Sequence, residues 1–170
     1  MAEYDQIRSL ADRIHAMEPS ARILTTYYCG PKDGEHLNDL FAMWDILDGA
    51  TSIYCTGVWS LSLDEGRAAQ CRASLKNGQE WWTYVCMSDH PGLAFNSVGT
   101  ANRAVLWRSW KEQSTGFLYW VVNSFSSMNP LRVRADLPQG DGLLLFPGEE
   151  FGTEGFCVSA RLERWRDGEE

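Results

Sequence analysis

The chain has 170 residues, enough for one domain or for part of a larger one. Hydrophobic residues make up 44% and aromatic residues 12%, so the composition gives no case for disorder. The net charge is −8 and no cluster of Lys and Arg stands out, which disfavours nucleic acid and anionic membranes as partners, because phosphate contacts need concentrated positive charge.

The cysteines and histidines carry no metal-site pattern. Five scattered cysteines form no C-x-x-C pair and three histidines lie far apart in the chain, so neither a metal nor a cofactor is expected. Free thiols in a reducing compartment are the simplest interpretation. No apolar leader and no run of 18 apolar residues occurs, so we expect a soluble, cytoplasmic protein.

The first half of the chain predicts two helix–strand pairs. Apolar residues at helical spacing predict a helix over Glu3–Met17, which Pro19 ends. A β-rich segment predicts a strand near 21–28, and a helix is expected over 38–47. Residues 51–59, rich in β-branched and aromatic side chains, predict the next strand.

The second half continues the alternation. Ser62 and Glu65 have the spacing of a capping box, which predicts a helix over 63–77. The next predicted elements are a strand over 81–87, a helix over 98–113, a strand over 116–123 and, after a long irregular stretch, a final helix over 159–167.

Strands that alternate with helices indicate an α/β fold of parallel strands covered by helices. The strands are continuous apolar runs, as expected when both faces are buried. Four such strands fit either an open doubly wound sheet or half of an eight-stranded barrel. Residues 1–170 are expected to form a single domain, because no linker divides them.

Ligands meet the C-terminal ends of the strands in both architectures. Aromatic and hydrogen-bonding residues gather there, and the expected ligand-binding residues are Tyr28, Trp59, Asp89, Trp120 and Asn123. A flat aromatic ring stacks on the apolar face of a sugar, so this set is typical of a carbohydrate-binding wall. For Tyr28 and Trp120, packing in the core is the competing interpretation.

The carboxylates give no clear catalytic pair. Asp89 and His90 could form an acid–base pair, although a solvated loop explains them as well. Asp64-Glu65 is better explained by helix capping, and Asp141 between two glycines indicates a turn. No phosphate-binding motif or nucleophile elbow is present, so no catalytic residue is predicted from the residues themselves.

Three segments near the end of the chain are distinctive: GFLYWVVN, GDGLLLFPG and SARLERWRDG. The residues that stand out in them are Gly116, Leu118, Tyr119, Trp120, Asn123, Gly140, Asp141, Gly142, Leu144, Pro147, Gly148, Ser159, Arg161, Leu162, Glu163, Arg166, Asp167 and Gly168. In this order, and with weaker echoes from about residue 50 onward, they resemble the C-terminal catalytic region of glycoside hydrolase family 123 and related barrel families.

The resemblance implies a TIM-type (β/α)8 barrel that removes N-acetylgalactosamine from glycans by substrate-assisted retention. An adjacent Asp-Glu pair then orients the acetamide and acts as general acid/base, an exception to the two-carboxylate scheme. The four strands here would be the C-terminal half of that barrel, with the acid pair expected just before Met1 and matched by no residue of this chain. Trp59, Trp120 and Asn123 would line the sugar pocket of a domain that is inactive alone.

Two other functions stay open: a non-catalytic module that binds carbohydrate or a small molecule, and an active hydrolase that uses carboxylates such as Asp89 or Glu149. A half-barrel leaves its edge strands unpaired, so a homo-oligomer is expected. A monodisperse monomer in light scattering would count against it. The alternative is an open sheet whose edges are covered by helices and by residues 124–142.

Overall fold

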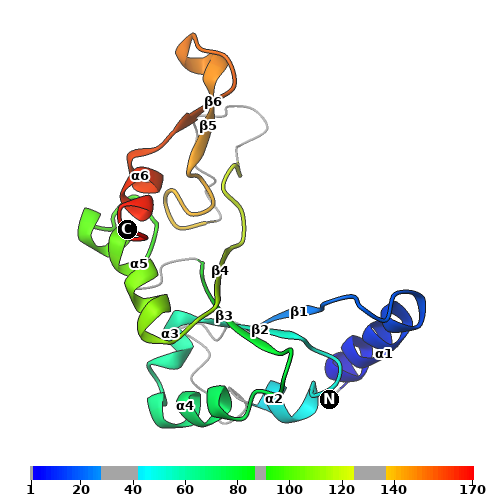
Figure 1. The fold of residues 1–170 in the computed structure, drawn as a ribbon. Helices are drawn as coiled ribbons and strands as arrows, with labels where there is room; N and C mark the ends of the chain where they lie inside the picture. Colours follow the sequence, from blue (N-terminus) through cyan, green and yellow to red (C-terminus); the bar gives the residue numbers. More distant parts are fainter. Residues whose placement is uncertain (1, 28–41, 87–90, 125–136) are drawn as a thin grey trace. The chain divides into compact units, whose positions relative to one another are not determined.

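The computed structural model describes residues 2–27, 42–86, 91–124 and 137–170 (Figure 1). Four strands form one parallel sheet in the order β1-β2-β3-β4. They are β1 (Leu24–Tyr27), β2 (Ile53–Gly57), β3 (Glu80–Val85) and β4 (Gly116–Tyr119). In the register of the first pair, Leu24 lies opposite Ile53 and Tyr27 opposite Thr56.

The strand order favours one of the two predicted architectures. A doubly wound sheet reverses its strand order at a switch point, whereas a barrel adds each strand beside the previous one. The observed order has no reversal, and all five residues of β2 are buried, as in a strand covered on both faces. The prediction of an α/β fold with parallel strands of a partial barrel is therefore confirmed.

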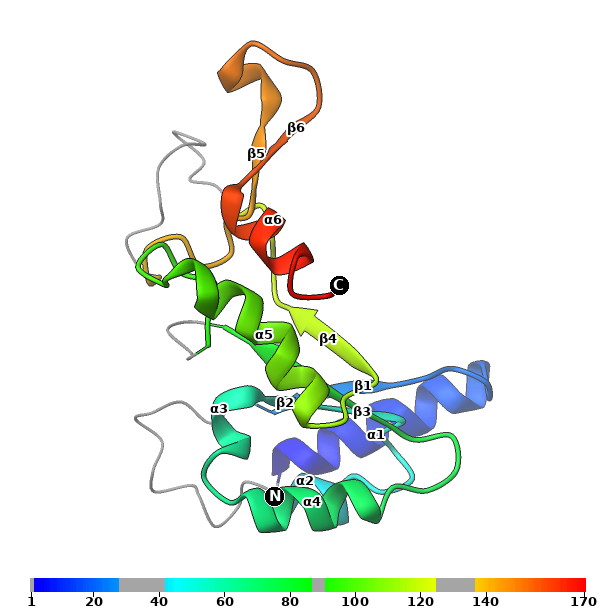
Figure 2. The same cartoon turned by 60° about the vertical axis from the view of Figure 1, so that its left-hand side comes forward.

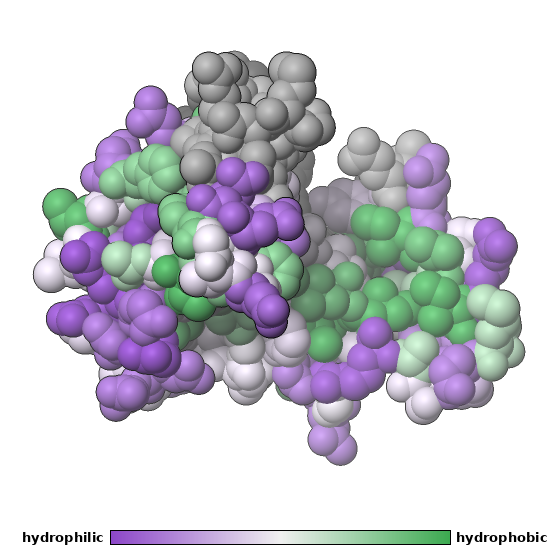
Figure 3. Space-filling model, turned by 90° about the horizontal axis from the view of Figure 1, so that it is seen from above, coloured by the Kyte–Doolittle hydropathy of each residue, from purple (hydrophilic) through white to green (hydrophobic). Residues whose placement is uncertain are grey.

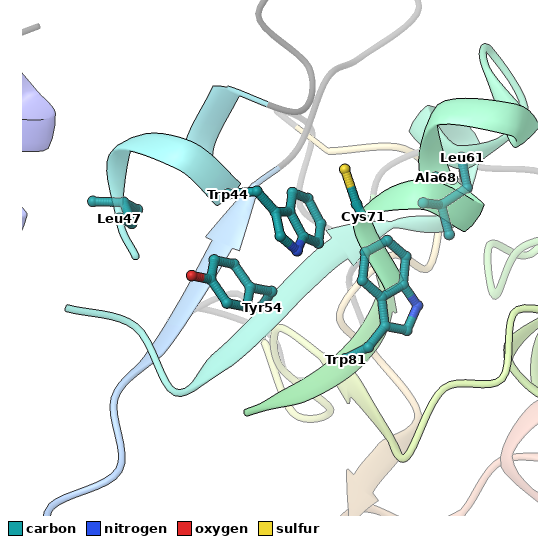
Figure 4. Packing of buried hydrophobic residues seen from close by; sticks show 7 residues of the cluster. All are labelled: Trp44, Leu47, Tyr54, Leu61, Ala68, Cys71 and Trp81. Atoms are coloured by element: carbon teal, nitrogen blue, oxygen red, sulfur yellow. The ribbon is translucent and has the colours of Figure 1, made fainter. Parts of the chain in front are cut away.

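The chain divides into two compact units, Met1–Thr83 with Ser114–Gly116, and Tyr84–Gln113 with Phe117–Glu170. The helices of the first unit are α1 (Ala2–Met17), α2 (Ala42–Ile46), α3 (Val58–Leu61) and α4 (Glu65–Ala73). An aromatic core lies among them (Figure 4). Trp44 stacks on Tyr54 with ring centroids 4.9 Å apart and is tilted against Trp81 at 4.8 Å, and such pairs add about 0.5–1.5 kcal/mol each beyond area burial.

In the second unit, α5 (Gly99–Lys111) and α6 (Ala160–Arg166) lie side by side in both Figure 1 and Figure 2. The T-shaped pair of Phe117 and Trp165, with centroids 5.1 Å apart, connects β4 to α6. A separate antiparallel hairpin consists of β5 (Leu145–Pro147) and β6 (Phe156–Val158), with the short helix η2 (Gly148–Phe151) in its loop.

Several element boundaries differ from the prediction. The strand predicted over 51–59 ends at Gly57, and the one predicted over 116–123 ends at Tyr119. The capping-box prediction was wrong in detail: α4 begins at Glu65 because the carboxylate of Asp64, not the hydroxyl of Ser62, accepts from the Arg67 amide at 2.8 Å. Strand β6 was not predicted, since three residues carry too little alternation to be recognised.

Part of the aromatic content lies on the surface. Figure 3 shows hydrophobic residues in green between hydrophilic ones on the face seen from above. Trp107, Trp110 and Trp120 have exposed fractions of 58%, 83% and 42%, so they are available for contacts outside the core. No helix in the described part of the chain is long and apolar enough to cross a lipid bilayer.

Candidate functional site

The structure describes two of the five predicted ligand-binding residues in full. Trp120 and Asn123 are described, whereas Tyr28 and Asp89 lie outside the described residues. Trp59 was predicted to end the strand, but β2 ends at Gly57 and the backbone of Trp59 belongs to α3, which follows it; the Trp59 side chain lies outside the described residues. The site is therefore built from the segment that follows β4.

Trp120 is the first residue after β4, at the C-terminal end of that strand. Its indole Nε1 donates a hydrogen bond to Oδ2 of Asp141 at 3.2 Å. The side chain nevertheless keeps 42% of its surface exposed, so Trp120 does not fill the core. One edge of the ring is fixed while part of the ring remains open to solvent.

Asp141 anchors this ring from below the surface. It is only 4% exposed, and its Oδ1 accepts a hydrogen bond from the Tyr119 hydroxyl at 2.8 Å. The amide of Gly142 donates to the same hydroxyl oxygen at 2.7 Å. Burial raises the pKa of Tyr119 far above its ordinary value of 10.0, so the hydroxyl stays protonated and remains a donor to Asp141.

Gly142 lets the backbone approach the indole closely. Its φ is +71°, and a Cβ at this position would lie 2.7 Å from Cζ2 of Trp120 and 2.7 Å from Cγ1 of Val121. Only glycine avoids both the left-handed strain and the overlap. The turn that carries Asp141 thus fits directly against the exposed tryptophan.

The side chain of Arg161, from α6, holds the same turn by hydrogen bonds to backbone oxygens. It is 7% exposed, and its guanidinium donates to the carbonyl oxygens of Leu93, Gly140 and Leu143, the second at 2.8 Å. Its Cζ lies 4.4 Å from the centroid of the Phe95 ring. Burial lowers the pKa of Arg161, an effect that the nearby negative charge of Asp141 opposes. The buried carboxylate therefore has a cation in its neighbourhood.

Asn123 is exposed, and its backbone forms an antiparallel bridge with Leu143. On either side of the bridge, Ser124 N–H donates to the Gly142 oxygen at 2.8 Å and Leu144 N–H donates to the Val122 oxygen at 2.8 Å. The chain after β4 is therefore paired with the segment that carries Asp141. This pairing fixes the backbone of Asn123 next to the segment that carries Asp141.

The groups gathered at this site can stack on a ligand and hydrogen-bond to it. The site combines an exposed indole, an exposed amide and a buried carboxylate that already accepts two side-chain hydrogen bonds. Within the described ranges, no group of three or more His, Cys, Asp or Glu side chains could hold a metal ion. Flat aromatic rings beside hydrogen-bonding amides suit the two faces of a sugar, one apolar and one rich in hydroxyls.

The predicted site residues did not include those that support Trp120, which are Tyr119, Asp141, Gly142 and Arg161. The glycines around Asp141 indicate a turn correctly, since both Gly140 and Gly142 have positive φ. They do not indicate that the carboxylate turns inward to Tyr119 and Trp120. The available signal was the occurrence of all four residues in the three distinctive segments, because the structure brings these segments together around one turn.

Comparisons with known proteins indicate the family and the fold of the chain. A family model described as glycoside hydrolase 123, catalytic domain, matches residues 48–170. Among solved structures, the chain is similar to a family 123 glycoside hydrolase from Clostridium perfringens whose structural analysis concerns glycolipid glycan hydrolysis, with a TM-score of 0.63 and 16% identity. The match covers 96% of this chain and 33% of that one, so this chain spans about a third of its length. No curated protein matches.

Proposed function

This chain belongs to the family of glycoside hydrolase 123 catalytic domains, and on that premise we propose that it forms a sugar-binding wall and performs no hydrolysis by itself. The ligand is a glycan that ends in N-acetylgalactosamine or a related N-acetylhexosamine. The observation that carries the proposal is Trp120: a half-exposed indole at the C-terminal end of β4, fixed through Nε1 to buried Asp141.

The fixed ring is suited to stacking on a sugar. A side chain that is already ordered loses little conformational freedom on binding, and an immobilised free side chain would cost about 0.5–1.5 kcal/mol. Asn123 is exposed and its backbone is fixed by the bridge to Leu143, and its side-chain amide offers two N–H donors and an oxygen acceptor for hydroxyl or acetamide groups. Stacking and hydrogen bonding together distinguish a sugar from a purely apolar ligand.

The proposal that the chain does not hydrolyse glycans depends on the structural roles of its candidate catalytic carboxylates. The only adjacent Asp-Glu in the sequence is Asp64-Glu65. Asp64 is the N-cap of α4, where its carboxylate accepts from the Arg67 amide, so this pair has a structural role. Asp141 is 4% exposed and engaged by Tyr119 and Trp120, which leaves it unsuited to proton transfer with a substrate.

Isothermal titration of the chain with N-acetylgalactosamine tests the binding proposal. We expect Trp120→Ala to weaken binding about tenfold, which corresponds to about 1.4 kcal/mol, because the stacking surface is lost. The matched control is Trp110→Ala, which removes an 83% exposed indole from α5. Equal affinity of the wild type and Trp120→Ala, or equal weakening by Trp110→Ala, would contradict the proposal.

Hydrolysis is tested separately with a chromogenic N-acetylgalactosaminide. The chain is expected to release no chromophore above the level of a heat-denatured sample. Turnover that is abolished by Glu149→Gln would instead establish an active hydrolase that uses a carboxylate of the hairpin loop. Glu149 is exposed at the start of η2, so this substitution does not disturb the core.

A further inference from the structure

The loop between β3 and α5 contacts the turn that carries Asp141, although the two lie far apart in the sequence. The backbone N–H of Phe95 donates a hydrogen bond to the Gln139 oxygen at 2.7 Å. The Phe95 ring lies directly against Gly140, where an added Cβ would be 2.3 Å from Cδ1 of the ring. Both segments belong to the same compact unit. Phe95 therefore supports this turn through its backbone and through its ring.

The two glycines beside Asp141 each pack against an aromatic ring. Gly140 lies against Phe95, and Gly142 lies against Trp120. Asp141 sits between them in two successive turns, which are closed by its own N–H to the Pro138 oxygen at 2.9 Å and by the Leu143 N–H to the Gly140 oxygen at 3.3 Å. The Asp141 carboxylate accepts from Nε1 of Trp120. A displacement of Gly140 is thus passed, one residue along the chain, to the group that fixes the indole.

The loop that carries Phe95 is itself firmly held. Asn102 of α5 is fully buried, and its Nδ2 donates to the Gly92 oxygen at 2.9 Å. Leu93 and Ala94 are buried as well, and the Ala94 oxygen accepts from the Ser97 N–H at 3.0 Å. Hydrogen bonds therefore fix the loop on both sides of Phe95. A side chain on such a support can hold a neighbouring segment in one position.

Arg161 closes the contact between the loop and the turn. Its guanidinium lies over the Phe95 ring, with Cζ 4.4 Å from the ring centroid, and it donates to the Gly140 oxygen at 2.8 Å. Without the Phe95 ring, the space beside Gly140 is empty and one face of the guanidinium loses its partner. The turn then gains freedom to move. An indole that has to be ordered during binding gives a lower affinity than an indole that is already held.

We propose that Phe95 is a positioning residue for the sugar-binding indole of Trp120, and that it acts through Gly140 and Asp141 without touching the sugar. This inference rests on the proposed function, in which Trp120 stacks on the sugar. It adds that the loop after β3 sets the affinity of a site whose binding residues follow β4.

Hydrogen exchange of the indole N–H groups tests the positioning role without any ligand. In protein labelled with ¹⁵N-tryptophan, the Trp120 signal is identified by its loss in Trp120→Phe. Phe95→Ala should accelerate exchange at Trp120 by about threefold or more and leave exchange at Trp81, in the core of the other unit, unchanged. The matched control is Phe156→Ala, which removes a 62% exposed ring from β6 and should change neither signal. Equal acceleration at Trp120 and Trp81 would show a general loss of stability and overturn the inference.

Titration with N-acetylgalactosamine tests the consequence for binding. Phe95→Ala should lower the affinity by about twofold to tenfold, because the indole must then be ordered by the ligand. Phe95→Tyr keeps an aromatic ring over Gly140 and Arg161 and should restore the wild-type affinity, and Phe156→Ala should leave the affinity unchanged.

A double-mutant cycle separates positioning from direct contact. In the Trp120→Ala background, Phe95→Ala should cause no further loss of affinity, because its effect passes through the indole that is already absent. An equal loss in both backgrounds would identify Phe95 as a sugar contact and overturn the positioning role.

The proposed function and the inference fail in different ways. No binding of N-acetylgalactosamine by the wild type refutes the proposed function, and the indole exchange rates still decide whether Phe95 holds Trp120. Binding by the wild type that Trp120→Ala weakens and Phe95→Ala leaves unchanged overturns the inference alone.

Discussion

Replacing Arg161 by Met removes the group that holds the Asp141 turn and keeps most of the side-chain volume. The guanidinium of Arg161 donates to the carbonyl oxygens of Leu93, Gly140 and Leu143, and it lies 4.4 Å from the Phe95 ring centroid. Methionine can fill the space between these groups but cannot donate a hydrogen bond. The substitution therefore tests whether the turn depends on this one side chain.

The expected loss of stability follows from the carbonyl oxygens and the Phe95 ring that lose their partner. A buried acceptor without its donor costs about 1–3 kcal/mol, and the contact with Phe95 contributes about 0.5–2 kcal/mol. The Gly140 oxygen keeps a weaker hydrogen bond from the Leu143 amide at 3.3 Å, so its loss lies at the low end. We expect Arg161→Met to lower the free energy of unfolding by about 3–5 kcal/mol. That is a large part of the 5–15 kcal/mol typical of a domain.

Urea denaturation followed by tryptophan fluorescence and circular dichroism measures this change. The control is Arg103→Met, which removes a surface ion pair with Asp167 at 3.0 Å, where the side chains are 46% and 37% exposed. Such a pair contributes less than about 1 kcal/mol. A loss of stability below about 1 kcal/mol for Arg161→Met, or equal losses for the two variants, would refute the argument that Arg161 supports the turn.

Two further predictions concern the same folded state. Gly142→Ala should lower the free energy of unfolding by about 2–4 kcal/mol in urea denaturation, because strain at φ +71° adds to the overlap with Trp120. The control is Gly152→Ala, where φ is the same and nothing lies within 4 Å of the added Cβ, so only the backbone strain lowers its stability. Equal losses in the two variants would contradict the role of Trp120. Burial raises the pKa of Tyr54 from 10.0 to about 12, because the folded state favours the neutral phenol. The stability that this preference adds is therefore complete below pH 10 and is lost as the pH rises toward 12. Between pH 9 and pH 11 the wild type should lose about 1.4 kcal/mol more unfolding free energy than Tyr54→Phe, and parallel pH profiles of the two proteins would contradict this assignment.

The elements with a strong repeating pattern could be predicted from the sequence. The helical spacing of apolar residues between Glu3 and Met17 gave α1 almost to the residue. The apolar runs gave all four parallel strands and their order along the chain. These signals are local. A buried helix face requires apolar residues at helical spacing, and a strand buried on both sides requires a continuous apolar run.

The ends of the strands and the interior of the site could not be predicted in the same way. Apolar residues continue past Tyr119, yet β4 ends there because Trp120 turns its indole toward Asp141 and Val122 pairs with Leu144 instead. Asp141 between glycines fits a solvated turn equally well from the sequence. Its burial depends on the Tyr119 hydroxyl more than twenty positions earlier in the chain, and no local pattern contains that contact.

The three distinctive segments acquire a common physical meaning once their contacts are known. Tyr119 and Trp120 come from the first, Asp141 and Gly142 from the second, and Arg161 from the third. None of these contacts moves a proton. They bury one carboxylate, hold one turn by its carbonyl oxygens and fix one indole at the surface. A sequence pattern built from such residues follows the packing of the turn after β4 more closely than any acid–base chemistry, so a chain can carry these three segments and still depend on other residues for catalysis.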